Sequence, residues 1–174
     1  MTIFTSLSRM YRSLLTSPTH SKSNLVFSPL SASSSLAMLF LGARGSTSWQ
    51  INELLRLDEM ISFNPHLLYK NVTESLAEAA TEGQEATAAC VKQMVVGMNE
   101  DPLIEFYKAR AAYFYGGTVS KADFSTIDTA IRDATDKMVS MKTGGKMEGF
   151  SGHDHPRPEP PLAMFAANYF KVGF

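Results

Sequence analysis

The strongest feature of the hydrophobic pattern is a small and apolar segment, residues 30–43, that contains no charged residue before Arg44. A helix built from such a segment has no side that could face water. Pro29 lacks a backbone donor and favours the first turn of a helix, so a short strand over residues 24–28 should end there. The pattern therefore predicts a strand followed directly by a central, buried helix.

A second helix should follow a glycine break at Gly42 and Gly45. Thr47 and Gln50 have the spacing of a capping box, which predicts that the helix begins at Thr47. Its apolar positions are Ile51, Leu54 and Leu55. Their spacing predicts a surface helix with one buried stripe.

Changes in the spacing of apolar residues indicate further helices and strands along the rest of the chain. Apolar residues at helical spacing predict helices over residues 4–15, 65–79, 102–115 and 126–141, and strand patterns cover residues 86–98, 118–124 and 160–174. In the last of these helices the apolar residues alternate between spacings of four and three. We therefore expect one narrow stripe, Ile127, Ile131, Met138 and Met141, to face a sheet, with Arg132, Asp136 and Lys137 turned away from it.

Composition is that of a globular protein: 44% of the 174 residues are hydrophobic and 19% are charged. One domain is the default for this length. The net charge of −1 offers no field for nucleic acid or anionic lipid, and the longest apolar run, residues 36–41, is too short to span a bilayer. We expect neither nucleic acid nor a membrane as partner.

The N-terminus and the single cysteine bear on location. Arg9 and Arg12 interrupt the apolar stretch that a signal peptide would need, and Cys90 excludes an intrachain disulfide framework. These features favour the cytoplasm. The alternative is an extracellular protein that is released without a leader or whose leader lies upstream of this sequence.

Candidate chemical groups do not assemble into a catalytic, cofactor or metal site in the sequence. Ser28 and Ser31 lack the signature of an activated nucleophile and are suited to capping the central helix. His153 and His155 lie in a proline-rich loop without third and fourth ligands at a recognisable spacing. We therefore expect a protein that is not an enzyme and uses no cofactor or metal.

The run NLVFSPLSASSSLAMLFLGARGSTSWQI, residues 24–51, resembles the N-terminal signature of the serpin family, and YGGTVSKADF, KTGGKM and the final strand resemble later serpin segments. This resemblance implies the mixed α/β serpin fold. Residues 1–174 would be the N-terminal half of a single serpin domain, with helices A to F, strands of sheet A and one strand of sheet B. An opening helix without a leader is similar to the intracellular, ovalbumin-like branch.

The resemblance implies an inhibitor of serine or cysteine proteases. In inhibitory serpins a cleaved reactive-centre loop inserts into sheet A beside strand 3, and no part of this chain matches that loop. We therefore expect residues 1–174 to be non-inhibitory by themselves; the alternative is a non-inhibitory serpin with a carrier, chaperone or storage role. In the position of helix D, Lys70 is accompanied by Glu74, Glu78 and Glu82, so activation by heparin is not expected.

The resemblance also implies a shutter, the polar cluster under sheet A whose hydrogen bonds break when the sheet opens. Ser28, Pro29 and Ser31 match its serine motif. The family's asparagine of strand 3 falls on Ala166, whereas this chain has Asn168 two residues later, on the same strand face. We expect both serine hydroxyls to be buried and bonded to backbone or to polar groups on residues 166–168.

Overall fold

The computed structural model describes residues 8, 11–13, 15–16, 28–59, 64–82, 87–98, 105–124, 128–149 and 162–171. Residues 24–27 of the predicted strand and the loop with His153 and His155 lie outside these ranges. The described residues between 8 and 16 are helical and exposed. None of the described helices is long and apolar enough to cross a membrane.

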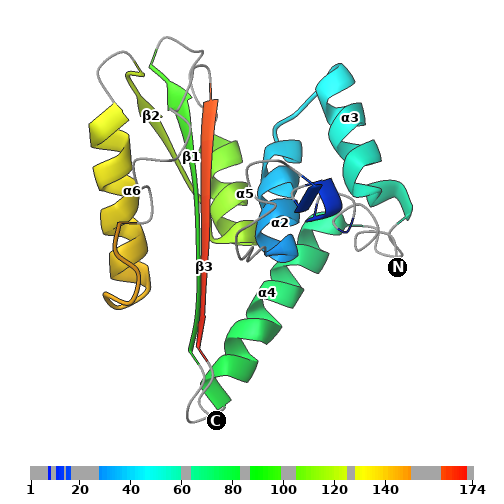
Figure 1. The fold of residues 1–174 in the computed structure, drawn as a ribbon. Helices are drawn as coiled ribbons and strands as arrows, with labels where there is room; N and C mark the ends of the chain where they lie inside the picture. The colour runs from blue at the N-terminus through cyan, green and yellow to red at the C-terminus, as the bar shows by residue number, and fades with distance from the viewer. Residues whose placement is uncertain are drawn as a thin grey trace.

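A sheet of three described strands forms the middle layer (Figure 1). Its strands are β2 (Thr118–Ala122), β1 (Thr87–Gly97) and β3 (Leu162–Lys171), in that spatial order. β1 is the central strand, parallel to β2 and antiparallel to β3. β3 is thus an edge strand within the described part of the chain.

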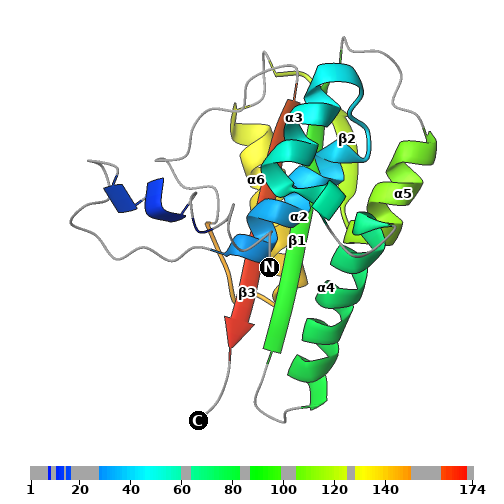
Figure 2. The same ribbon diagram turned by 90° about the vertical axis from the view of Figure 1, so that its right-hand side faces the viewer.

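Helices cover both faces of this sheet (Figures 1 and 2). They are α2 (Pro29–Phe40), α3 (Gly45–Leu55), α4 (Pro65–Glu82), α5 (Glu105–Tyr115) and α6 (Asp128–Lys142), with a 3-10 turn at Leu57–Glu59. α6 packs on one face, and α2, α4 and α5 pack on the other, with α3 outside α2. The mixed α/β fold expected from the sequence is therefore present, with the predicted central helix against the sheet.

Two hydrophobic clusters lie on opposite sides of β1, which explains why apolar residues occur on both parities of this strand. Met94 joins the larger cluster, which is built around α2 and α5 and includes Met38. Val91 joins the smaller one with Val139 of α6 and Ala167 of β3. The buried section of β1 runs from Val91 to Val95.

α2 packs tightly against the sheet where Met38 meets the residue before β2. A Cβ atom on Gly117 would lie 2.6 Å from the Met38 sulfur, so only glycine fits there. Tyr107 of α5 secures the contact, because its hydroxyl donates to the Met38 carbonyl at 3.0 Å. Met38 is fully buried, so its side chain cannot move aside without disturbing the core around it.

The prediction that α3 begins with a capping box at Thr47 is wrong. The helix begins at Gly45, its N-cap is Arg44, and no side chain bonds to the first turn. Gly45 has a φ of +57°, a conformation that glycine adopts readily, so the chain can turn into the helix two residues earlier. Ile51 and Leu55 are buried as expected, whereas Leu54 is exposed.

The expected sheet-facing stripe of α6 needs a correction at Met141, which is 74% exposed. The buried positions are Thr135 and Val139, with Met138 half-buried beside them. Thr135 donates to Gln93 of β1 at 3.1 Å, which sets the rotation of the helix. A pattern that counts threonine as polar cannot find this face. Ile127 and the side chain of Ile131 lie outside the described residues.

We predict that Gly117→Ala lowers the free energy of unfolding by about 1 to 3 kcal/mol, because the new methyl group overpacks against Met38. In a Met38→Ala background the same change should cost clearly less, because the clashing atoms are gone. Urea unfolding of the four proteins measures this coupling. Equal costs in both backgrounds would show that Met38 is not the obstacle.

Candidate functional site

The start of α2 meets the edge strand β3 through one side chain. Ser28 is the N-cap of α2, with an extended backbone (φ −100°, ψ 102°), and its hydroxyl oxygen accepts from the backbone N–H of Ser31 at 3.2 Å. The same oxygen accepts from the side-chain amide of Asn168 at 3.0 Å. Pro29 is the first helical residue and is exposed. We call this contact the Ser28–Asn168 junction.

Register explains how Asn168 reaches the helix. Its Cα pairs with that of Cys90, and Ala166 pairs with Lys92, so all four residues lie on the sheet face that α2 covers. Asn168 itself is exposed because β3 is at the edge. The structure thus brings together Ser28 and Asn168, two residues 140 positions apart in sequence.

Ser31 does not join this junction, and the expectation that its hydroxyl bonds to β3 is wrong. The hydroxyl oxygens of Ser31 and Ser35 are shielded from solvent and have no hydrogen-bond partner in the described structure. Ser33 and Ser34 differ, because their hydroxyls donate to carbonyls of the preceding turn of α2. Within the described part of the chain, one side of the central helix therefore carries two polar atoms without a hydrogen-bond partner.

Lys92 is a buried residue that sequence reasoning missed. Only 2% of its surface is exposed, and its ammonium group donates to the sulfur of Cys90 at 3.0 Å. Lysine is rarely buried without a charged partner. The strand pattern did not predict this contact, because it assigns residues to the faces of a sheet and does not identify their hydrogen-bond partners.

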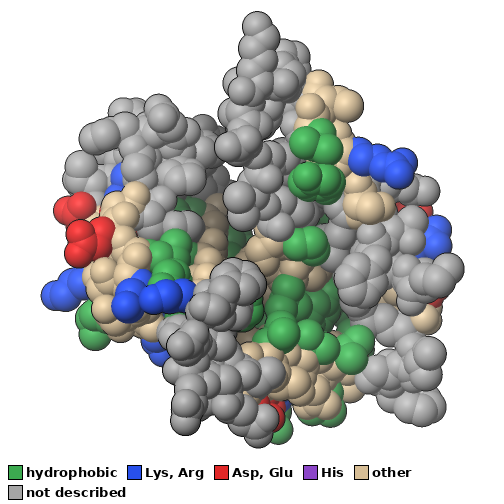
Figure 3. Space-filling model, turned by 60° about the horizontal axis from the view of Figure 1, so that its bottom comes forward, with side chains coloured by type: hydrophobic (Ala, Val, Ile, Leu, Met, Phe, Trp, Pro, Cys, Tyr) green, Lys and Arg blue, Asp and Glu red, His purple; other side chains and the backbone are tan. Residues whose placement is uncertain are grey.

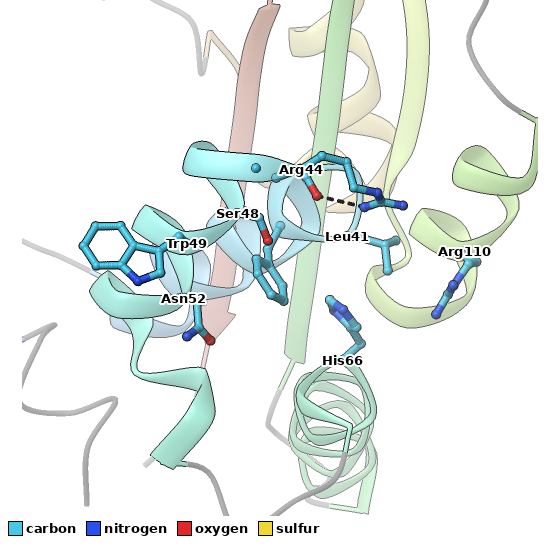
Figure 4. A pocket seen from close by; sticks show the side chains of 10 residues that line it. Leu41, Arg44, Ser48, Trp49, Asn52, His66 and Arg110 are labelled. Atoms are coloured by element: carbon cyan, nitrogen blue, oxygen red, sulfur yellow. Dashed lines mark hydrogen bonds between the residues drawn. The ribbon is translucent and has the colours of Figure 1, made fainter.

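A pocket lies beyond the other end of α2, where α3, α4 and α5 approach one another (Figure 4). Its volume is about 510 Å³. His66 of α4 and Arg110 of α5 line one side, and Arg44, Ser48 and Trp49 line the side formed by the start of α3. Sequence analysis did not single out any of these as site residues, because they are spread over segments that only the fold brings together.

His66 is packed among aromatic rings at this pocket. Its ring centroid lies 5.8 Å from that of Phe40 and 5.6 Å from that of Phe114, and Nδ1 bonds with the Tyr115 hydroxyl. Burial, and then the positive charge of Arg110, lower the pKa of His66 from 6.5 to about 4. Burial also raises the pKa of Tyr115, so its hydroxyl keeps its proton. His66 is therefore neutral at neutral pH.

We predict that replacing two serines of the same motif, Ser28 and Ser31, has different effects on the stability of the protein. Ser28→Ala should lower the free energy of unfolding by about 1 to 2 kcal/mol, because it removes both the N-cap and the junction. Ser31→Ala should leave the stability unchanged or raise it, since it removes a buried hydroxyl that has no partner. Chemical denaturation of both variants decides this. A loss in Ser31→Ala as large as in Ser28→Ala would mean that Ser31 has a partner.

The low pKa of His66 predicts a stability that depends on pH. Below pH 6.5 the unfolded chain binds a proton that the folded chain does not bind until about pH 4, so the stability should fall between these values. His66→Gln should remove this part of the pH dependence. Unfolding free energies from pH 7.5 to 4 test it, and an NMR titration that placed the imidazole pKa near 6.5 would contradict it.

Comparisons with known proteins identify the fold around these sites. The family model described as serpin (serine protease inhibitor) matches residues 7–173. Ovalbumin of Dromaius novaehollandiae is 24% identical over 161 residues, which cover 87% of this chain and 42% of that protein. Serpin B9 of Homo sapiens is 28% identical, covering 88% of this chain and 39% of that protein. Leukocyte elastase inhibitor A of Mus musculus is 28% identical, with 85% and 38% covered.

Solved structures agree on the architecture. AtSerpin1 of Arabidopsis in its native stressed conformation superposes with a TM-score of 0.80 at 16% identity, covering 96% of this chain and 42% of that one. The chain spans less than half the length of ovalbumin, serpin B9 or leukocyte elastase inhibitor A. It belongs to the serpin family, of the ovalbumin-like branch, and it contains about half of the serpin fold with three strands of sheet A.

Proposed function

We propose that the protein represented by this chain inhibits a serine or cysteine endopeptidase by the serpin mechanism. Membership of the family supports the proposal, and a relative at 28% identity is named leukocyte elastase inhibitor A. In that mechanism the cleaved reactive-centre loop enters sheet A beside strand 3. The position of strand 3 corresponds to β3 here.

The observation that carries the proposal is the polar contact between the C-terminal part of β3 and the start of α2. Along β3 only Ala167 is fully buried, and Phe170 is 67% exposed. Seen from the lower end of the molecule, hydrophobic side chains gather in the middle of the face with lysine and arginine on both sides (Figure 3). At the start of α2 a side-chain bond between neutral groups, the Ser28–Asn168 junction, links the helix to the strand and contributes only about 1 kcal/mol. Leu162 and Met164, at the other end of β3, pack against the core around Met38. The junction can break when a sheet opens.

We further propose that residues 1–174 alone do not inhibit and do not act as an enzyme. No stretch of the sequence matches the reactive-centre loop. The Ser28 hydroxyl oxygen accepts from two N–H groups, and neither of these could act as the base that a serine nucleophile needs. A non-inhibitory serpin, with a carrier, chaperone or storage role, is the alternative for the whole protein.

The test uses two proteins, residues 1–174 and the full product of the reading frame. Each is mixed with trypsin-like, chymotrypsin-like and papain-like proteases, and products are separated in detergent. We expect a covalent, detergent-resistant complex from the full product with at least one protease and none from residues 1–174. Cleavage of the full product without any complex would favour the non-inhibitory alternative. A complex formed by residues 1–174 would overturn the second proposal.

A further inference from the structure

The pocket beyond the C-terminal end of α2 is separate from the Ser28–Asn168 junction. The twelve residues of α2 place the two ends about 18 Å apart. Figure 4 shows the arginines, His66 and Leu41 around one hollow, with Asn52 and Trp49 on the opposite side and the Trp49 indole pointing away from the arginines. A volume of about 510 Å³ is within the range that holds small organic molecules. Its lining decides which class of molecule would fit.

The charge in the pocket has one sign. Arg44 and Arg110 line it, and none of its lining residues is acidic. A guanidinium nitrogen of Arg44 donates to the Ala43 carbonyl at 2.8 Å, and Arg110 lies over the rings of Phe106 and Phe114, 5.1 and 5.6 Å from their centroids. Neither arginine forms an ion pair with a described residue. Two guanidinium groups without carboxylate partners favour an anion.

The start of α3 adds to this field. Gly45 and Ser48 line the pocket, the first turn of the helix contains no acidic residue, and no side chain caps it. The free N–H groups of a helix start carry a partial positive charge. The start of the helix and the two arginines therefore both favour a negatively charged ligand.

The remaining lining suits a flat ring. Trp49 is 63% exposed at the rim, and Phe40 and Leu41 are apolar. Nδ1 of His66 bonds with the Tyr115 hydroxyl, so Nε2 is the ring nitrogen left for a polar contact with a ligand. Asn52 offers a further polar contact.

We propose that this pocket binds a small organic anion that carries an aromatic ring next to a carboxylate or similar acidic group. The acidic group lies between the guanidinium groups of Arg44 and Arg110, and the ring lies against the apolar side chains of Phe40 and Leu41. This site is distinct from the surface used in the proposed inhibitory function, and it does not depend on that function.

The test measures binding of 4-nitrobenzoate to residues 1–174 by calorimetry. Its neutral counterpart 4-nitrobenzamide and inorganic phosphate, an anion without a ring, are the controls. Trp49 is the only tryptophan of the chain, so quenching of its fluorescence reports on this pocket. We expect 4-nitrobenzoate to bind more tightly than either control and to quench Trp49.

Variants locate the site. Arg44→Gln and Arg110→Gln should each weaken binding of 4-nitrobenzoate about tenfold or more, as expected for the loss of a charged hydrogen bond. Arg56→Gln is the matched control, because Arg56 lies outside the pocket and pairs with Glu59. It should bind as the parent does.

A second change guards against variants that fail to fold. Ser48→Glu puts a carboxylate into the pocket near the start of α3, where an acidic residue is compatible with the helix. It should abolish binding while the thermal unfolding curve stays unchanged. Equal binding of 4-nitrobenzoate and 4-nitrobenzamide, or full binding by folded Ser48→Glu protein, would overturn the proposal.

Discussion

The close packing of α2 against the sheet is the constraint on which the rest of the structure depends. Met38 fits between the helix and the sheet only because Gly117 has no side chain, and Tyr107 fixes the backbone of α2 at the same point. α3 packs on the outer side of α2, while α4 contacts both α2 and β1. A change in the position of α2 relative to the sheet would therefore disturb its contacts with α3, α4, α5 and β3.

The two ends of α2 have different chemistry, which follows from what each end leaves unpaired. At the N-terminal end Ser28 caps the helix and accepts from Asn168, so the contact is neutral and can be exchanged for water at little cost. At the C-terminal end the chain turns through Gly45 into a helix without a cap, and the neighbouring arginines have no carboxylate partner among the pocket's lining residues. One end is suited to a contact that breaks, and the other to holding an anion.

The sequence predicted the elements well and their faces less well. The segment without charges became α2, and the two-parity apolar pattern became the central strand β1, because both signals arise from burial on all sides. The errors arose at polar groups whose hydrogen-bond partners could not be identified from the neighbouring sequence. Thr135 is buried through Gln93, and α3 begins at a glycine and not at the threonine of an apparent capping box. The arginine pocket could not be predicted, because its residues come from four helices and their connections and meet only through packing.

The sheet face beneath α2 changes from apolar to polar along β1. Met94 and Val96 pack with Met38 and its neighbours, whereas Lys92 and Cys90 lie nearer to Asn168 and Ser28. Apolar burial is costly to undo, while hydrogen bonds of neutral groups are replaced by bonds to water. The Met38 end of α2 is therefore the fixed part of this layer, and the Ser28 end is where β3 can separate from the helix. A buried lysine in that polar section, bonded to a thiol, makes tight closure still less favourable, since an ammonium group loses more hydration than the sulfur returns. In the proposed inhibitory function, opening would therefore begin at the Ser28 end of α2, where β3 makes a polar contact, and not at the Met38 end, where Leu162 and Met164 of β3 pack against the core.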